Sequence, residues 1–246
     1  MTYLFNELLY RPLLNLLFFI YNNVFSDLGL AIILLTIIIR FVLLPLFYKS
    51  AKDQTILQSL APRVREIQKT HKENKEKQVQ EIMSVYREHK VSPFSGILLL
   101  LIQLPILIAL YKVFLKGFSS EVFAQLYSFV PAPETVHSLF LGFIDLNENS
   151  LLLVIVAALF QYLQSYFLMR VARQSSSGDQ KDKTALFAEK LSKQMVFVGP
   201  LLTLVILYSL PSAVALYWLT TSAFSVVQQL IINKKIHGNA ARTTNS

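Results

Sequence analysis

One arginine stands inside an otherwise apolar run, and its position predicts chemistry. The run reads GLAIILLTIIIRFVLLP from Gly29 to Pro45, and its charged residue is Arg40. A helix over 28–48 would rise about 1.5 Å per residue, or roughly 30 Å, which is the thickness of a bilayer's hydrocarbon layer. Inserting a central arginine costs roughly 2.5–3.5 kcal/mol, and each strongly apolar neighbour offsets about 0.3–0.6 kcal/mol of this. The segment is therefore expected to span a membrane with a cation inside it.

The sequence offers Arg40 no acidic partner within the membrane. None of the fifteen Asp and Glu residues lies in a predicted span, so an intramembrane salt bridge is excluded. We interpret Arg40 as a buried cation that lines a wet, polar cavity. The alternative is an arginine that snorkels toward the end of its helix, although Lys49 already marks that end.

Further polar residues share helix faces within the apolar segments. Thr36 lies one turn before Arg40 on the same face. If this face and the polar stripes of two later spans converge, they line a groove. The alternative for each residue is a hydrogen bond to a neighbouring helix, which is common in membranes. The stripes consist of Gln161, Gln164 and Ser165, and of Tyr217, Thr221, Ser225 and Gln228.

The composition predicts an all-α polytopic membrane protein. Hydrophobic types make up 54% of the 246 residues, which is too much for the core of a soluble domain of this size. The chain has no cysteine, which excludes disulfides, thiolate metal sites and a catalytic thiol. We expect no metal or other cofactor.

The distribution of basic residues predicts which segments face the cytoplasm. The formal net charge is +8, yet no Lys or Arg lies between 117 and 150. By the positive-inside rule, the chain is expected to cross the membrane five times, with its N-terminus outside and its C-terminus in the cytoplasm. The predicted spans are 28–48, 94–115, 149–169, 195–210 and 212–232; the cytoplasmic segments are 49–93, 170–194 and a basic tail at 233–246; the outer segments are 1–27 and 116–148.

Two segments outside the spans are expected to be helical. Residues 1–27 hold an apolar run broken by Arg11, Pro12 and Asn15, which we interpret as an interfacial helix rather than a cleaved signal peptide. Residues 49–93 hold two short apolar stripes at helical spacing on either side of a polar turn. These stripes predict a cytoplasmic hairpin of two amphipathic helices rather than a solvated linker.

Four motifs resemble those of the YidC membrane-protein insertases and their Oxa-type relatives. The likeness extends over nearly the whole chain, with the motifs in the family's order. They are GLAIILLTIIIRFVLLPL at 29–46, LAPRVREIQK at 60–69 followed by YREHKVSPF at 86–94, QLPILIALY at 103–111, and PSAVALYWLTTSAFSVVQQ at 211–229. The absence of a large domain between the first two apolar regions resembles the short bacterial form.

The resemblance implies an insertase that helps newly made membrane proteins to enter the bilayer without nucleotide hydrolysis. Its groove would open to the cytoplasm and to lipid, with Arg40 as its charged residue and with Gln103 and Trp218 from the motifs among the substrate-binding side chains. Nascent membrane proteins and the bilayer are the implied partners, together with the ribosome and the Sec translocon, and DNA is not. The implied location is a bacterial plasma membrane.

Two other functional classes were weighed. A small-anion channel or transporter could use Arg40 as a counter-ion, but the chain shows no duplicated topology and few Gly or Pro breaks. An intramembrane protease would need a base within the spans, and all four histidines lie outside them. We therefore expect a protein that is not an enzyme, with the anion channel as the alternative function.

Overall fold

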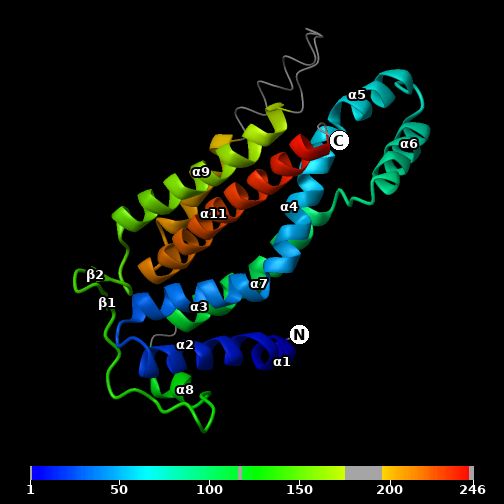
Figure 1. Cartoon of the computed structure of the whole chain (residues 1–246). Coiled ribbons are helices and arrows are strands. Elements are labelled where there is room, and N and C mark those ends of the chain that lie inside the picture. Colours follow the sequence, from blue (N-terminus) through cyan, green and yellow to red (C-terminus); the bar gives the residue numbers. More distant parts are fainter. Residues whose placement is uncertain (1, 116–117, 175–195, 244–246) are drawn as a thin grey trace.

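The computed structural model describes residues 2–115, 118–174 and 196–243, and these are mostly helical, which confirms the predicted helical class (Figure 1). A short antiparallel pair of strands is the exception. The helices are α1 (Thr2–Phe5), the π-helix η1 (Asn6–Tyr10), α2 (Arg11–Asn23), α3 (Leu28–Val42), α4 (Leu44–Ser59), α5 (Ala61–Thr70), α6 (Lys75–Glu88), α7 (Ser95–Leu115), α8 (Ser120–Phe123), α9 (Leu151–Gln174), an unlabelled helix Val196–Leu207 and α11 (Ser212–Thr243); the strands are β1 (Leu139–Phe140) and β2 (Ile144–Asp145).

The arginine-bearing helix differs from the single helix predicted over 28–48. Helix α3 ends at Val42, and α4 starts at Leu44 with its axis bent by 64°. Pro45 lies in the first turn of α4, where a backbone N–H would have no acceptor within the helix, so the missing N–H of proline costs no hydrogen bond there. Helix α4 runs on to Ser59, so residues 49–59 of the predicted 49–93 segment belong to α4.

Judged by length and apolar composition, one stretch of the described residues, Ser212–Ile231, is long enough to cross a membrane alone. The bent pair α3 and α4 qualifies only as a unit. The other predicted spans coincide with shorter apolar stretches of α7, of α9 and of the unlabelled helix, namely Leu101–Leu115, Leu151–Phe167 and Val196–Leu207. The number of five spans and their membrane boundaries stay predictions. The predicted segment 170–194 falls largely outside the described residues, as do the last residues of the tail.

Helices α5 and α6 form a pair that extends from the rest of the molecule (Figure 1). Gln78 Nε2 donates to the Gln68 carbonyl oxygen at 3.1 Å, and His71 Nε2 lies 2.9 Å from Glu81 Oε1. Ile67 is buried. Among the described elements, the main packing partner of α5 in the rest of the molecule is α4. We call this side of the molecule the hairpin end.

The opposite side, which we call the loop end, is covered by the segment 118–150. Asp27 ties it to α3, since Oδ1 accepts from Leu30 N at 3.0 Å and Oδ2 accepts from Leu141 N at 2.9 Å. Gly29 permits a close approach, because a Cβ there would lie 2.1 Å from the Phe140 ring. The strand pair turns at Gly142, whose φ of +81° suits glycine.

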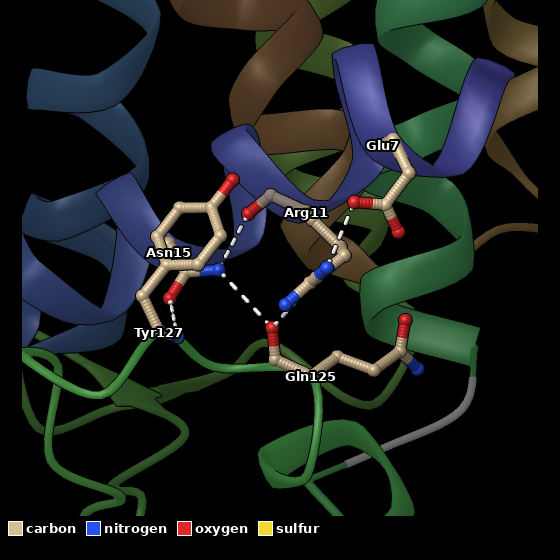
Figure 2. A network of polar contacts seen from close by, with 5 residues as sticks. All are labelled: Glu7, Arg11, Asn15, Gln125 and Tyr127. Carbon is tan, nitrogen blue, oxygen red and sulfur yellow. Dashed lines mark hydrogen bonds and ion pairs between the residues drawn. The ribbon is translucent and has the colours of Figure 1, made fainter.

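A polar network fixes the N-terminal helix to the same segment (Figure 2). Arg11 Nη1 lies 2.8 Å from Glu7 Oε2, and Arg11 Nε donates to the Gln125 carbonyl oxygen at 3.3 Å. Asn15 is buried, and its Oδ1 accepts from Tyr127 N at 2.6 Å. Of the residues that interrupted the apolar run of 1–27, Arg11 and Asn15 therefore bind the 118–150 segment, whereas Pro12 lies in the first turn of α2.

Apolar packing is concentrated toward the loop end. Helices α2, α3, α7 and α11 contribute buried aliphatic and aromatic side chains to one cluster, and the loop adds Val122, Val130 and Phe140. Ser212 N donates to the Glu148 carbonyl oxygen at 2.8 Å, so the start of α11 is also held by the loop. This end of the helix bundle is thereby filled by side chains.

Candidate functional site

The buried side chains change from apolar to polar part-way along the helices. On α3 they are apolar from Leu28 to Leu35, and then come Thr36 and Arg40. On α11 they are apolar from Ala213 to Leu216, and then come Tyr217 and Ser222. We call the polar residues beyond the apolar cluster the polar layer: Thr36, Arg40, Gln103, Gln161, Tyr217 and Ser222.

Arg40 is buried without a counter-ion. Its residue exposure is only 4%, its Cζ lies 4.4 Å from the centroid of the Phe47 ring, and its Nη1 has no hydrogen-bond partner. Within the part of the chain that the structure describes, Arg40 forms no ion pair with Asp or Glu. The bend at Leu43 brings Phe47 against the guanidinium, and this cation–π contact supplies part of the stabilisation that water would otherwise give.

Tyr217 connects three helices of the polar layer. Gln103 Nε2 of α7 donates to its hydroxyl oxygen. The same hydroxyl lies near enough to Arg40 of α3 to interact with it electrostatically. Of the predicted residues, the structure thus brings Arg40, Gln103 and Tyr217 together.

Gln161 of α9 lies at a contact between helices. Its Oε1 accepts from Ser222 Oγ of α11 at 3.0 Å. On its other side, a Cβ built at Gly199 would lie 3.6 Å from Gln161 Nε2 and 3.8 Å from Ser165 Oγ. Gln161 and Ser165 therefore face the helix Val196–Leu207, and Gln161 bonds a neighbouring helix as the alternative interpretation foresaw. Gln164 is half-buried on α9.

The other predicted residues divide into those that are satisfied locally and those that are not. Thr36 Oγ1 donates to the Ile32 carbonyl oxygen at 2.7 Å, and Ser225 Oγ donates to that of Thr221 at 2.9 Å. In contrast, Trp218 Nε1 and Gln228 Oε1 are buried atoms without a hydrogen-bond partner. Thr221 Oγ1 is likewise buried and unpaired. Buried polar atoms are normally paired, so the donors on Arg40 and Trp218, the hydroxyl of Thr221 and the acceptor on Gln228 remain for a bound chain.

Two contact residues were not foreseen from the sequence. Ser222 lies off the stripe of Tyr217, Thr221, Ser225 and Gln228, so periodicity could not select it. Phe47 appeared as an ordinary apolar residue of a straight helix, and only the bend explains its contact with Arg40. No group of three or more His, Cys, Asp or Glu suited to a metal ion occurs among the described residues.

The sequence was compared with known protein families and with solved structures. A family model described as 60Kd inner membrane protein matches residues 19–240. The chain belongs to this family. Membrane protein insertase MisCB of Bacillus subtilis is 32% identical over 243 residues, which cover 95% of this chain and 81% of the relative. Membrane protein insertase YidC of Fusobacterium nucleatum is 31% identical over 235 residues, which cover 96% of this chain and 99% of the relative.

A solved structure supports the same fold. The crystal structure titled "Active YidC insertase crystal structure with the first transmembrane domain resolved" superposes with a TM-score of 0.59 at 21% identity, and the match covers 92% of this chain and 46% of that chain. The family resemblance inferred from the four motifs is confirmed. Because the relatives are insertases, the expectation that the protein is not an enzyme is confirmed as well, and membership places the protein at a cell membrane.

Proposed function

We propose that the protein inserts newly made membrane proteins into the bilayer through a hydrophilic groove centred on Arg40, without nucleotide hydrolysis. The observation that carries this proposal is the buried, unpaired guanidinium where the apolar cluster gives way to the polar layer. A buried cation without a counter-ion lowers stability, which favours a role in binding over a role in folding.

The chemistry of Arg40 and its neighbours suggests how a client would enter. The short polar flank of a client that must cross the membrane would lie in the groove, where Arg40 attracts its acidic residues. Trp218 Nε1 and Gln228 Oε1 would supply hydrogen bonds in place of water. By replacing hydration at this step, the groove would lower the barrier to crossing.

The client's apolar segment would leave the groove along the apolar surfaces of α9 and α11. Ile155 and Leu159 on α9 and Val227 and Ile231 on α11 are exposed. The free energy would come from burial of the client's own helix in lipid, at about 25 cal/mol per Å² of apolar surface. No chemical energy source is then required.

The proposed orientation puts the loop end outside a bacterial plasma membrane and the hairpin end in the cytoplasm. Two features support it: the Lys and Arg residues avoid 117–150, and the apolar cluster fills the loop end. Nascent membrane proteins are the proposed partners. Ribosome docking through basic residues of the 233–246 tail, and cooperation with a Sec translocon, remain the expectations drawn from the family resemblance.

Reconstituted vesicles test the proposal. Purified protein in liposomes should convert a single-span test protein with a short acidic flank into a protease-protected form, and empty liposomes should not. Arg40→Met should reduce this protection, whereas Arg11→Met, which removes a guanidinium paired with Glu7 near the loop end, should not. Flux of a small anion without any protection of the test protein would instead support the anion channel.

A further inference from the structure

A second buried charge lies on the hairpin side of Arg40. Asp53 of α4 is only 5% exposed, and its carboxylate has no ion pair and no hydrogen bond among the described residues. Lys49, one turn earlier on the same helix, is exposed and does not pair with it. An ionised carboxylate without partners is expensive to bury, so a purely structural role is a poor explanation for Asp53.

Asp53 belongs to a polar face of α4 that continues from the arginine site. Phe47 packs on Arg40, and Ser50 follows one turn later, buried, with its Oγ accepting from Gln54 Nε2 at 3.3 Å. Asp53 lies one turn beyond Ser50, about 9 Å along the helix from Phe47. Gln58 Oε1 is another buried acceptor without a partner.

The two positions present opposite chemistry to a bound chain. Around Arg40 the unpaired buried atoms include the donors Arg40 Nη1 and Trp218 Nε1. Helix α4 carries acceptors instead: the buried, unpaired Gln58 Oε1, and the Asp53 carboxylate, which has no ion pair or hydrogen bond among the described residues. Helix α4 packs against α7, α9 and α11, which are the helices that carry the rest of the proposed groove. A chain lying along this path would meet a cation first and an anion nearer the hairpin end.

We propose that Asp53 binds the basic flank of a client, the Lys or Arg residues that follow its apolar segment and stay on the hairpin side. This inference rests on the proposed insertase function and adds a substrate preference to it. Arg40 would hold the acidic flank that crosses, while Asp53 would hold the basic flank that does not. The pair would therefore select the orientation of the client as well as bind it.

The experiment uses two clients that differ only in the retained flank. One carries three lysines there and the other carries three glutamines, and both keep the same acidic crossing flank. The full-length protein in liposomes should insert the lysine client roughly three times faster or more, as expected for a partly desolvated charge pair. Asp53→Asn should bring this ratio close to one through slower insertion of the lysine client. The glutamine client reports on folding, because its insertion should be unchanged.

Two further variants separate binding from structure. Asp53→Glu keeps the charge and should restore the preference. Glu134→Gln removes an exposed acid from the 118–150 segment at the opposite end of the molecule and should leave the preference intact. The proposal is overturned if Asp53→Asn keeps the full preference, or if it slows both clients equally. If wild-type protein inserts neither client, the insertase function itself fails, and if it inserts both equally, only the role of Asp53 fails.

Discussion

Arg11 and Arg40 differ in their contacts, and the difference indicates a structural role for Arg11 and a functional role for Arg40. Arg11 is paired with Glu7, donates to the Gln125 carbonyl oxygen and lies 5.2 Å from the centroid of the Tyr127 ring. Arg40 has the Phe47 ring but no acid, and one of its nitrogens is unpaired. Arg11 therefore stabilises the fold, whereas Arg40 has an unpaired hydrogen-bond donor and a positive charge that a ligand could engage.

Replacing Arg40 should separate stability from function. We expect Arg40→Met to leave the thermal midpoint of the purified protein unchanged or a few degrees higher, because an unpaired buried charge is removed. Insertion of a client with an acidic flank should fall roughly tenfold, which corresponds to about 1.4 kcal/mol. Thermal unfolding in detergent and the protease-protection assay measure the two effects.

Arg11→Met is the matched control. It should show the opposite pattern, with stability lower by about 1 kcal/mol from the lost charged hydrogen bonds and with insertion by the folded protein near wild type. A loss of stability in Arg40→Met as large as that in Arg11→Met would contradict the functional interpretation of Arg40.

At the scale of elements, the start of α3 and the loop end are stabilised through one carboxylate. Asp27 caps α3 and also accepts a hydrogen bond from Leu141 N. We expect Asp27→Ala to lower the free energy of unfolding by about 1–2 kcal/mol, because both orphaned N–H groups lose their acceptor. Glu121→Ala, at an exposed position of the 118–150 segment, should change it by less than about 0.5 kcal/mol. Equal effects of the two variants in thermal unfolding would rule out the capping role.

The α5–α6 pair is expected to serve clients or partners rather than the membrane core. The Gln78–Gln68 hydrogen bond and the His71–Glu81 contact both lie within the pair, and α4 is its main packing partner among the described elements, so removing the pair should expose little of the rest of the molecule. Deletion of residues 64–86 with a short Gly-Ser linker should leave a stable, membrane-inserted protein with impaired insertion activity. Membrane fractionation and pulse-chase turnover check this outcome, and rapid degradation would show instead that the pair is structural.

The elements also show where sequence reasoning was sufficient. Apolar periodicity predicted the helical class and the positions of the shorter apolar helices, since burial sets these patterns. It did not predict the bend at Leu43, because Pro45 suits both a kink and a helix start. Asp53 was assigned to the polar cytoplasmic segment 49–93, and its burial was not predicted because it depends on the direction of α4, which is a tertiary property.

At the scale of the whole molecule, apolar and polar packing are segregated along one direction. Apolar side chains fill the loop end, while the polar layer and Asp53 lie toward the hairpin end. Pattern analysis pointed to Arg40 and Tyr217, and the family resemblance to Gln103, but how these side chains pair depends on long-range helix packing that periodicity does not encode. The same holds for Gln161, whose partner Ser222 is 61 residues away.

The absence of cysteine makes the predicted orientation directly testable. We expect a single cysteine at Ser225, half-buried on α11, to react with a membrane-impermeant maleimide added from the cytoplasmic side of cells or inverted vesicles. A cysteine at Ser128, exposed in the outer segment, should react only from the opposite side. Reversed labelling of the two positions would contradict the proposed topology.

Contact between a client and the polar layer is the central claim, and site-specific photocrosslinking measures it. A photoreactive phenylalanine analogue replaces Trp218, whose indole nitrogen is unpaired, or Phe143, which is 67% exposed at the loop end. Ribosomes stalled on a short membrane protein supply the client. The account predicts a strong crosslink from position 218, weakened by Arg40→Met, and little from position 143. Crosslinks of equal strength from both positions, or none from position 218 while insertion proceeds, would contradict it.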